Sequence, residues 1–460
     1  MIDSFRNILA IPDLRKRLAF TFGLLAVYRV GCNIPTPGID PQALLEFMQS
    51  VQGTLLGMVN TFTGGSLERL TVFALGIMPY ITASIVLQLL TVVWPYLEKL
   101  SKEGELGRRK ITQYTRYLTM VISIIQSTGI AVWIERMTTP GGAGLVPNPG
   151  WGFRLMTVLT LTTGCAFVMW LGEQITERGI GNGISLIIFA GIVVALPGAI
   201  ADTMTNIQTG SMSIITLLIL CVFMVAVVAF IVYMERAQRR IPVQYAKRVV
   251  GRKIYGGQNT YLPLRVNTGG VIPVIFASSI VMIPATVAGM FQNEWLQTIA
   301  GYLAWGQPLH YLLYVAAIIF FSYFYVSIIF NPADTAENMR KYGGFIPGIR
   351  SGRRTSEYID KVLTRLTLVG AVYLAAVSVL PEFLLSGIQV QGIPGIGDTL
   401  DAALPEWVTR GMGINFYFGG TSLLIVVGVA MDFVQQVESQ LVMRNYEGFM
   451  KRGRVRGRRG

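Results

Sequence analysis

Charged residues are scarce in this sequence. Asp, Glu, Lys and Arg make up 14% of its 460 residues, whereas an ordinary soluble domain carries about 25%. Hydrophobic residues make up 52% and occur in long runs rather than in alternating patterns. This composition excludes a disordered chain, a coiled coil and a soluble nucleic-acid-binding module, and it argues against a water-soluble enzyme. It indicates a polytopic membrane protein.

Residues that usually carry chemistry are also few. The three cysteines, Cys32, Cys165 and Cys221, lie far apart, and the single histidine, His310, has no partner in the sequence. These positions exclude a disulfide framework and a metal site built from closely spaced Cys and His ligands. The sequence contains no HExxH, GxSxG or GxxxxGK[ST] motif, and Gly179-Ile180-Gly181 lacks the rest of a dinucleotide fingerprint. We therefore predict no catalytic residue, no metal, no cofactor and no enzymatic activity.

Ten apolar runs are each about long enough to span a bilayer, which takes roughly 20 residues. We expect an all-α protein with ten transmembrane helices. The runs cover about 18–34, 71–94, 115–134, 155–172, 183–201, 212–234, 269–291, 309–330, 362–381 and 415–433. The first run is the weakest, because Arg29 and Pro35 interrupt its end.

The basic residues are distributed unevenly between the connections. If the chain crosses at every run, 33 of the 38 Lys and Arg residues fall on one side and four on the other, with Arg29 at the outer end of the first run. The positive-inside rule makes the rich side cytoplasmic. Both termini are then cytoplasmic, as an even number of spans requires. Ten helices can form two halves of five, and an odd number per half makes any repeat between them an inverted one.

The runs lack the ionisable pairs at mid-depth that ion-coupled transporters use. Their charges cluster near the ends, at Arg29, Arg116, Glu173 and Asp432. A secondary transporter of a small solute stays the alternative function, and solute- or proton-dependent flux would distinguish it. In either case, energy for movement would come from a partner or from the membrane potential.

Two isoleucine pairs have helical spacing. Ile77 and Ile81 are four residues apart, as are Ile184 and Ile188, so the members of each pair share a helix face. Such isoleucines usually face lipid or pack against other helices. The alternative is a hydrophobic constriction that keeps water and ions out of a pore. Periodicity does not choose between these interpretations.

Two cytoplasmic connections, 235–268 and 331–361, are long, basic and rich in Gly, Pro and aromatic residues. They act either as topology determinants that contact anionic lipid or as a docking surface for a large partner, including one that contains RNA.

Seven strings in order resemble the SecY family, the channel subunits of bacterial and related protein translocases, and most closely its proteobacterial branch. The resemblance spans nearly the whole chain. The strings are Phe62–Leu67, Phe73–Ile81, Gly107–Tyr117, Trp170–Gly183, Gly269–Phe276, Phe345–Arg350 and Tyr417–Ile425.

The resemblance implies two inverted five-helix halves around a central hourglass pore. It implies a channel that passes unfolded preproteins across the bacterial inner membrane and releases transmembrane segments sideways into lipid. A constriction ring would seal the pore, and a plug at about 53–70 would close the outer funnel. The implied ring residues are Ile77, Ile81, Ile184, Ile188, Ile275 and Ile425, and the implied plug residues are Phe62, Gly64, Gly65, Leu67 and Arg69. Gly64-Gly65 would supply a hinge-capable joint to the next helix.

Two further sets of residues follow from the resemblance. The lateral gate would include Thr82, Gln126, Ser278 and Ser279, and contacts to the SecA ATPase or the ribosome would include Arg239, Arg240, Arg252, Lys253 and Arg350. The implied partners are the small subunits SecE and SecG, SecA, the ribosome, signal sequences and nascent chains, membrane lipids, and the accessory proteins SecDF and YidC.

The expected organisation follows the runs. It comprises a cytoplasmic amino end (1–17), the first five-helix half (18–201), an outer loop with the sixth helix (202–234), a basic loop (235–268), the seventh and eighth helices (269–330), a second basic loop (331–361), the ninth and tenth helices (362–433) with an outer loop (382–414), and a basic tail (434–460). We expect the Arg- and Gly-rich end, 451–460, to be disordered and bound to anionic lipid or ribosomal RNA.

Overall fold

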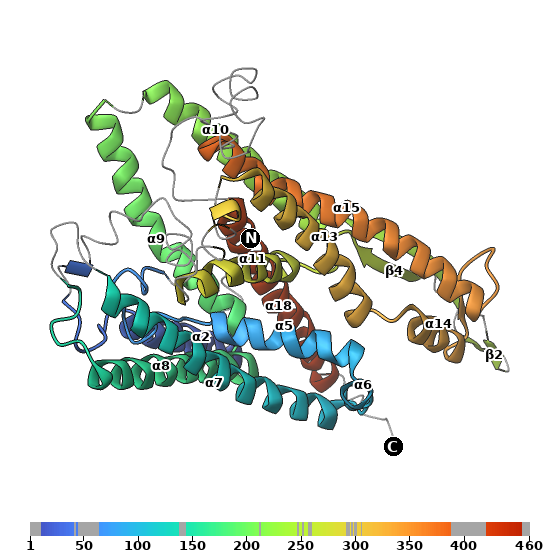
Figure 1. Ribbon diagram of the computed structural model, residues 1–460. Helices are drawn as coiled ribbons and strands as arrows, with labels where there is room; N and C mark the ends of the chain where they lie inside the picture. The colour runs from blue at the N-terminus through green and yellow to red at the C-terminus, as the bar shows by residue number, and fades with distance from the viewer. Residues whose placement is uncertain are drawn as a thin grey trace. The chain divides into compact units, whose positions relative to one another are not determined.

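Each of the ten apolar runs contains a helix in the computed structural model (Figure 1). The structure describes residues 11–40, 43–44, 64–137, 144–210, 213–245, 248–250, 253–255, 260–290, 295, 298, 301–304, 306–387 and 420–452. The ten helices are α2 (Pro12–Gly31), α5 (Met78–Val93), α7 (Glu105–Arg136), α8 (Trp151–Arg178), α9 (Gly183–Gln208), α10 (Ile214–Arg236), α11 (Ile272–Met290), α13 (Pro308–Ile329), α15 (Arg353–Ser386) and α18 (Gly420–Arg452).

Within the described ranges, seven of these helices are long and apolar enough to cross a membrane: α7, α8, α9, α10, α13, α15 and α18. The count rises to eight if α5 and the short α6 (Pro95–Lys102), which meet at a 99° bend, form one span. Of the other two, α2 includes Asp13 and the basic residues 15–17, whereas α11 is 19 residues long and contains no charged side chain.

Proline fixes several helix starts. Prolines lie in the first turns of α2, α5, α6 and α13, where a missing backbone N–H leaves no hydrogen bond unmade. The effect is largest at the second run, expected from residue 71, because Pro79 starts α5 only at Met78. Gly76, with φ +54°, lies in the turn before it. Residues 71–77 are therefore not helical.

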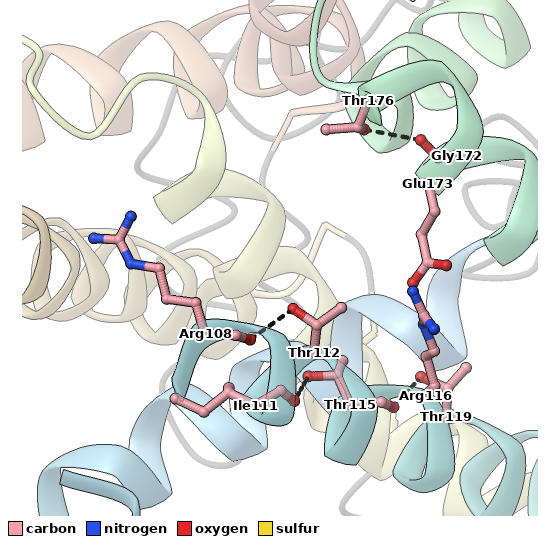
Figure 2. Close-up of polar contacts among 9 residues, drawn as sticks. All are labelled: Arg108, Ile111, Thr112, Thr115, Arg116, Thr119, Gly172, Glu173 and Thr176. Carbon is pink, nitrogen blue, oxygen red and sulfur yellow. Dashed lines mark hydrogen bonds and ion pairs between the residues drawn. The ribbon is translucent and has the colours of Figure 1, made fainter. Parts of the chain in front are cut away.

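The chain divides into two compact units. The first comprises Met1–Asp202, Met282–Trp305 and Val429–Gly460, and the second comprises Thr203–Val281 and Gly306–Gly428. In the first unit, α7 and α8 form an antiparallel hairpin joined by polar contacts at three levels. Arg116 Nε lies 2.7 Å from Glu173 Oε1 (Figure 2), the hydroxyls of Ser127 and Thr162 are 3.3 Å apart, and an ion pair joins Arg154 to Glu135.

These three contacts share one register. The number of residues between successive contacts is the same on both helices. On α7 the contacts fall at Arg116, Ser127 and Glu135, and their partners on α8 are Glu173, Thr162 and Arg154, in the reverse direction. At 1.5 Å per residue, the two ion pairs lie about 28 Å apart, close to the roughly 30 Å thickness of a bilayer's hydrocarbon core. The two ion pairs are therefore spaced to lie at the two boundaries of the bilayer's hydrocarbon core.

We expect the Arg116–Glu173 pair to stabilise the hairpin measurably. Glu173→Gln should lower the free energy of unfolding by about 1–2 kcal/mol, because Glu173 is only 14% exposed although Arg116 is 44% exposed. The charge swap Arg116→Glu with Glu173→Arg should restore most of it. Thermal unfolding in detergent measures both. The matched control is Glu98→Gln, which removes the exposed pair with Lys102 and should change little. No loss in the single variant would contradict the prediction.

The second unit contains a small folded element where two long basic loops were expected. Strand β1 (Gln238–Tyr245) pairs antiparallel with β4 (Thr260–Arg265) and also with β5 (Gly344–Phe345). Helix α14 (Pro332–Lys341) precedes β5, and a separate short hairpin pairs β2 (Arg248–Val250) with β3 (Lys253–Tyr255). We refer to β1, β4, β5, α14 and the first turns of α15 as the basic platform.

The basic platform has its own hydrophobic core. The core residues come from both loops and from α15, and they are Ile241, Val243, Leu264, Met339, Ile346 and Ile359. Backbone pairing and burial therefore join the two stretches that were expected as basic loops. Two extents also differ from expectation, because α15 begins at Arg353 inside the second basic loop and α18 continues to Arg452. Residues 453–460 lie outside the described part of the chain.

Candidate functional site

Residues 64–73, here termed the anchor segment, lie against the end of α2. Arg29 Nη1 donates to the Gly64 carbonyl at 2.9 Å, and Arg69 Nη1 donates to Asn33 Oδ1 at 3.1 Å. Asn33 in turn donates its side-chain amide to the Arg29 carbonyl at 2.9 Å. One arginine from each segment therefore binds the other segment.

Backbone hydrogen bonds extend this attachment beyond the two arginines. The Thr36 amide donates to the Leu70 carbonyl and the Val72 amide donates to the Ile34 carbonyl, both at 2.9 Å. Leu67, in the same segment, is buried in a hydrophobic core. Residues 64–70 of the anchor segment are the carboxyl-terminal part of the predicted plug. The rest of that stretch, residues 53–63 with Phe62, lies outside the described residues.

Glycines on the neighbouring helices leave room for the anchor segment to pack closely. A side chain on Gly31 of α2 would overlap the Phe73 ring, and one on Gly164 of α8 would overlap the Val72 carbonyl. Gly64 itself has φ +67°, and a Cβ there would lie 2.8 Å from Gly191 Cα of α9. A side chain at Gly64 would therefore not fit, whereas Gly65, with φ +82°, has open space around its Cα. The hinge-capable joint at Gly64-Gly65 stays a prediction.

The predicted ring residues occupy two helices in each unit. In the first unit, Ile77 caps α5, Ile81 follows one turn later, and Ile184 and Ile188 lie on α9. In the second unit, Ile275 lies on α11 and Ile425 on α18. The exposed fractions are 6% for Ile77, 5% for Ile81, 4% for Ile188, 7% for Ile275 and 0% for Ile425, and Ile184 is half-buried.

Burial separates the interpretations that periodicity left open. Five of the six isoleucines are covered by protein, so the lipid-facing interpretation does not hold for them. Ile184 packs over Gly172 of α8. Burial is compatible both with a packing role and with a pore constriction.

The predicted gate hydroxyls bond within their own helices. Thr82 donates to the Met78 carbonyl at 3.1 Å, and Ser278 and Ser279 both donate to the carbonyl of Ile275, at 2.9 and 2.8 Å. A hydroxyl that donates to its own helix can serve another helix only as an acceptor. Gln126, half-buried on α7, has no hydrogen-bond partner among the described residues, so its amide is the gate group with donors to spare.

Two of the predicted docking arginines lie on strand β1 of the basic platform. Arg239 and Arg240 are both exposed, but they are consecutive residues of β1 and so point to opposite faces of the strand. Arg239 shares its face with the buried Ile241 and Val243, and Arg240 lies on the other face. The pair therefore presents two separate charges rather than one cluster.

Arg350 lies in the turn between β5 and α15. It is exposed, its carbonyl accepts a hydrogen bond from Thr355 Oγ1 at 3.0 Å, and its guanidinium has no ion-pair partner in the described part of the chain. Lys253 begins β3, of whose side chains nothing is described, and Arg252 lies outside the described residues.

No group of three or more His, Cys, Asp or Glu side chains in the described ranges could hold a metal ion. The cysteines are free thiols, buried at Cys32 and Cys165 and exposed at Cys221.

The residue that sequence reasoning missed is Arg29, which was noted only as a charge at the end of a run. Its contact with Gly64 spans 35 residues, and no local pattern indicates it.

Comparison with known proteins gives matches over nearly the whole chain. A family profile described as SecY matches residues 71–434. The chain is 51% identical over 451 residues to the protein translocase subunit SecY of Escherichia coli K12, which covers 97% of this chain and 96% of that protein. It is 43% identical over 453 residues to the same subunit of Aquifex aeolicus, covering 98% and 100%. These relatives are translocase subunits rather than members of an enzyme family.

Solved structures share the fold. One described as "The structure of a protein conducting channel" aligns with a TM-score of 0.62 at 17% identity and covers 92% of this chain and 91% of that chain. Another, which reports that the plug domain of SecY stabilises the closed state and maintains a membrane seal, aligns at 0.59 and 18% identity with the same coverage. Sec61 in a canine ribosome–channel complex aligns at 0.58 and 17%, again covering 92% and 91%.

Proposed function

Because the chain belongs to the SecY family, we propose that it is the central protein-conducting channel of a bacterial Sec translocase. It passes unfolded preproteins across the inner membrane and releases transmembrane segments sideways into the bilayer. The observation that carries this proposal is the 51% identity to a translocase subunit across 97% of the chain. Both termini are cytoplasmic in this proposal, as the distribution of Lys and Arg supports.

In this proposal, Ile77, Ile81, Ile184, Ile188, Ile275 and Ile425 form the constriction between the two five-helix halves. An apolar ring of this kind excludes water and ions until a polypeptide displaces it. It also closes around chains of varied sequence, whereas a polar ring would bind some of them tightly. The burial of five of these side chains excludes a lipid-facing position for them and is compatible with the constriction.

The stretch from about 53 to 70 is the proposed plug, and Thr82, Gln126, Ser278 and Ser279 line the proposed lateral gate. The gate's polar groups make the closed seam only modestly stable, because hydrogen bonds between membrane helices contribute about 0.6 kcal/mol on average. The hydroxyls of Thr82, Ser278 and Ser279 already donate within their own helices. Most of the gate's donor capacity therefore comes from Gln126, and an apolar signal sequence displaces few bonds.

The basic platform, the turn that carries Arg350 and the segment with the Arg252-Lys253 pair are the proposed docking surface for the SecA ATPase and the ribosome, together with Arg239 and Arg240 of β1. Exposed guanidinium groups suit both the acidic face of a protein and the phosphates of RNA. A fold shared with Sec61, solved in a ribosome–channel complex, supports the ribosome as a partner. SecE and SecG are the proposed small membrane subunits.

Reconstitution tests the function. The chain is co-purified with SecE and SecG in proteoliposomes, and SecA, ATP and a radiolabelled preprotein are added. We expect the preprotein to become protease-protected only when SecA and ATP are present. Proton-dependent flux of a small solute without SecA, combined with no protection of the preprotein, would support a secondary transporter instead.

A further inference from the structure

We propose that Arg29 is a positioning residue for the seal: its guanidinium holds the Gly64 carbonyl and so fixes the carboxyl-terminal end of the plug to α2. This inference rests on the proposed function, since it assigns a residue to the plug of that channel. The carrying observation is the 2.9 Å hydrogen bond from Arg29 Nη1 to the Gly64 carbonyl.

The position of Arg29 suits this role. It lies in the last turn of α2, where a cation is stabilised by the unpaired carbonyls of the helix end. Its own carbonyl accepts from Asn33, whose side-chain oxygen receives the Arg69 guanidinium. Arg29 is half-buried, so its bond to Gly64 is shielded from water more than the exposed contact between Arg69 and Asn33 is.

The chain around Gly64 is closely packed, and residues that follow it are held by backbone hydrogen bonds. The backbone of Gly191 lies on one side, so close that a Cβ on Gly64 would meet Gly191 Cα at 2.8 Å. On the other side, Thr36 and Val72 donate into the backbone pairing that holds residues 70–72 to the chain after α2. With both ends of the anchor segment held, displacement of the plug requires either rotation before Gly64 or loss of the Arg29 bond.

Loss of the hydrogen bond between Arg29 and Gly64 is expected to let ions leak through the closed channel rather than to unfold the protein. A hydrogen bond to a charged group stabilises more than a neutral one, and the remaining backbone bonds keep residues 70–72 in place. Loss of the Arg29 bond should therefore shift the balance between closed and displaced plug by about tenfold, while the helices around it stay folded.

The test measures ion conductance in planar bilayers for the full chain with its small subunits, without preprotein. We expect Arg29→Gln to raise the resting conductance by about tenfold, and Arg29→Lys, which keeps the charge and one donor direction, by less. The matched control is Arg136→Gln, which changes an exposed arginine in the last turn of α7 and should stay within about twofold of the wild type. Resting conductance equal to wild type in folded Arg29→Gln would overturn the proposal.

A second measurement covers the case in which Arg29→Gln fails to accumulate. Leu67→Cys is introduced into a chain whose three cysteines are replaced by alanine, and labelling by an externally added, membrane-impermeant maleimide is timed. Leu67 is 5% exposed, so labelling should be slow, and Arg29→Lys should speed it several-fold. An unchanged labelling rate would count against the proposal.

The wild-type chain separates the two levels of inference. If the wild type conducts when a signal peptide is added and Arg29→Gln leaks at rest, both the channel function and the role of Arg29 are supported. If the wild type responds but the variant is as tight as the wild type, only the role of Arg29 fails. If the wild type never conducts with a signal peptide and never protects a preprotein, the proposed function itself fails.

Discussion

Replacing Arg350 by glutamate is expected to lower SecA-dependent preprotein translocation by about 30-fold or more. Arg350 is exposed and without an ion-pair partner among the described residues, so its guanidinium is free to pair with a partner's carboxylate or phosphate. Removing one member of a desolvated charge pair costs about 2–5 kcal/mol, and reversal adds repulsion. The measurement is ATP-driven translocation into membrane vesicles that contain equal amounts of each variant.

Arg353→Glu is the matched control for this prediction. Arg353 lies three residues away and is also exposed, but it already pairs with Glu357 at 3.0 Å within α15. We expect translocation within about threefold of wild type. Membrane insertion of the Arg350→Glu chain itself should be unaffected. Equal translocation by wild type and Arg350→Glu would remove Arg350 from the docking surface.

Replacing Ile77, Ile81, Ile184 and Ile188 together by asparagine is expected to raise the ion conductance of the closed channel by about tenfold or more. Asparagine brings amide donors and acceptors that hold water, so a constriction that stays dry with isoleucine becomes wet. The reading is the resting current across planar bilayers, without preprotein.

The control separates a pore from ordinary packing. Ile124 and Ile125 are 47% and 54% exposed on α7, and their replacement by asparagine should leave the closed channel tight. If the four ring isoleucines only pack against other helices, their replacement would lower the melting temperature without a current. A channel that is folded and as tight as wild type after the fourfold change would argue against the ring.

The positions of the helices follow from the sequence because a run of about 20 apolar residues has few other solutions. The ends were less predictable. Pro79 shortens the second run from its amino end, whereas α15 and α18 extend beyond the apolar residues into basic sequence. Helix propagation past the last apolar residue depends on packing and capping rather than on hydropathy.

The basic platform was not foreseen, for a related reason. Strand β1 shows an alternating signal, with Ile241 and Val243 on one face, and could have been identified as a strand. Its pairing with β5, as between Gln244 and Phe345, joins residues about a hundred positions apart. Non-local pairing of this kind leaves no local pattern in the sequence.

In the candidate site too, local features could be predicted from the sequence and long-range contacts could not. The shared face of Ile77 and Ile81 follows from helical spacing, but what that face meets does not. The contact of Arg29 with Gly64 depends on three helices, each with a glycine at the right level. Resemblance supplied the list of ring and plug residues, and only coordinates could show that Gly64 is confined while Gly65 is not.

The basic platform also has a mechanical consequence. Strand β1 follows α10, β4 precedes α11, α13 leads into α14, and β5 leads into α15. Four helix ends, those of α10, α11, α13 and α15, thus meet one small folded element with a shared core. In the proposed docking, force applied to a single arginine there would reach all four helix ends at once instead of bending one loop.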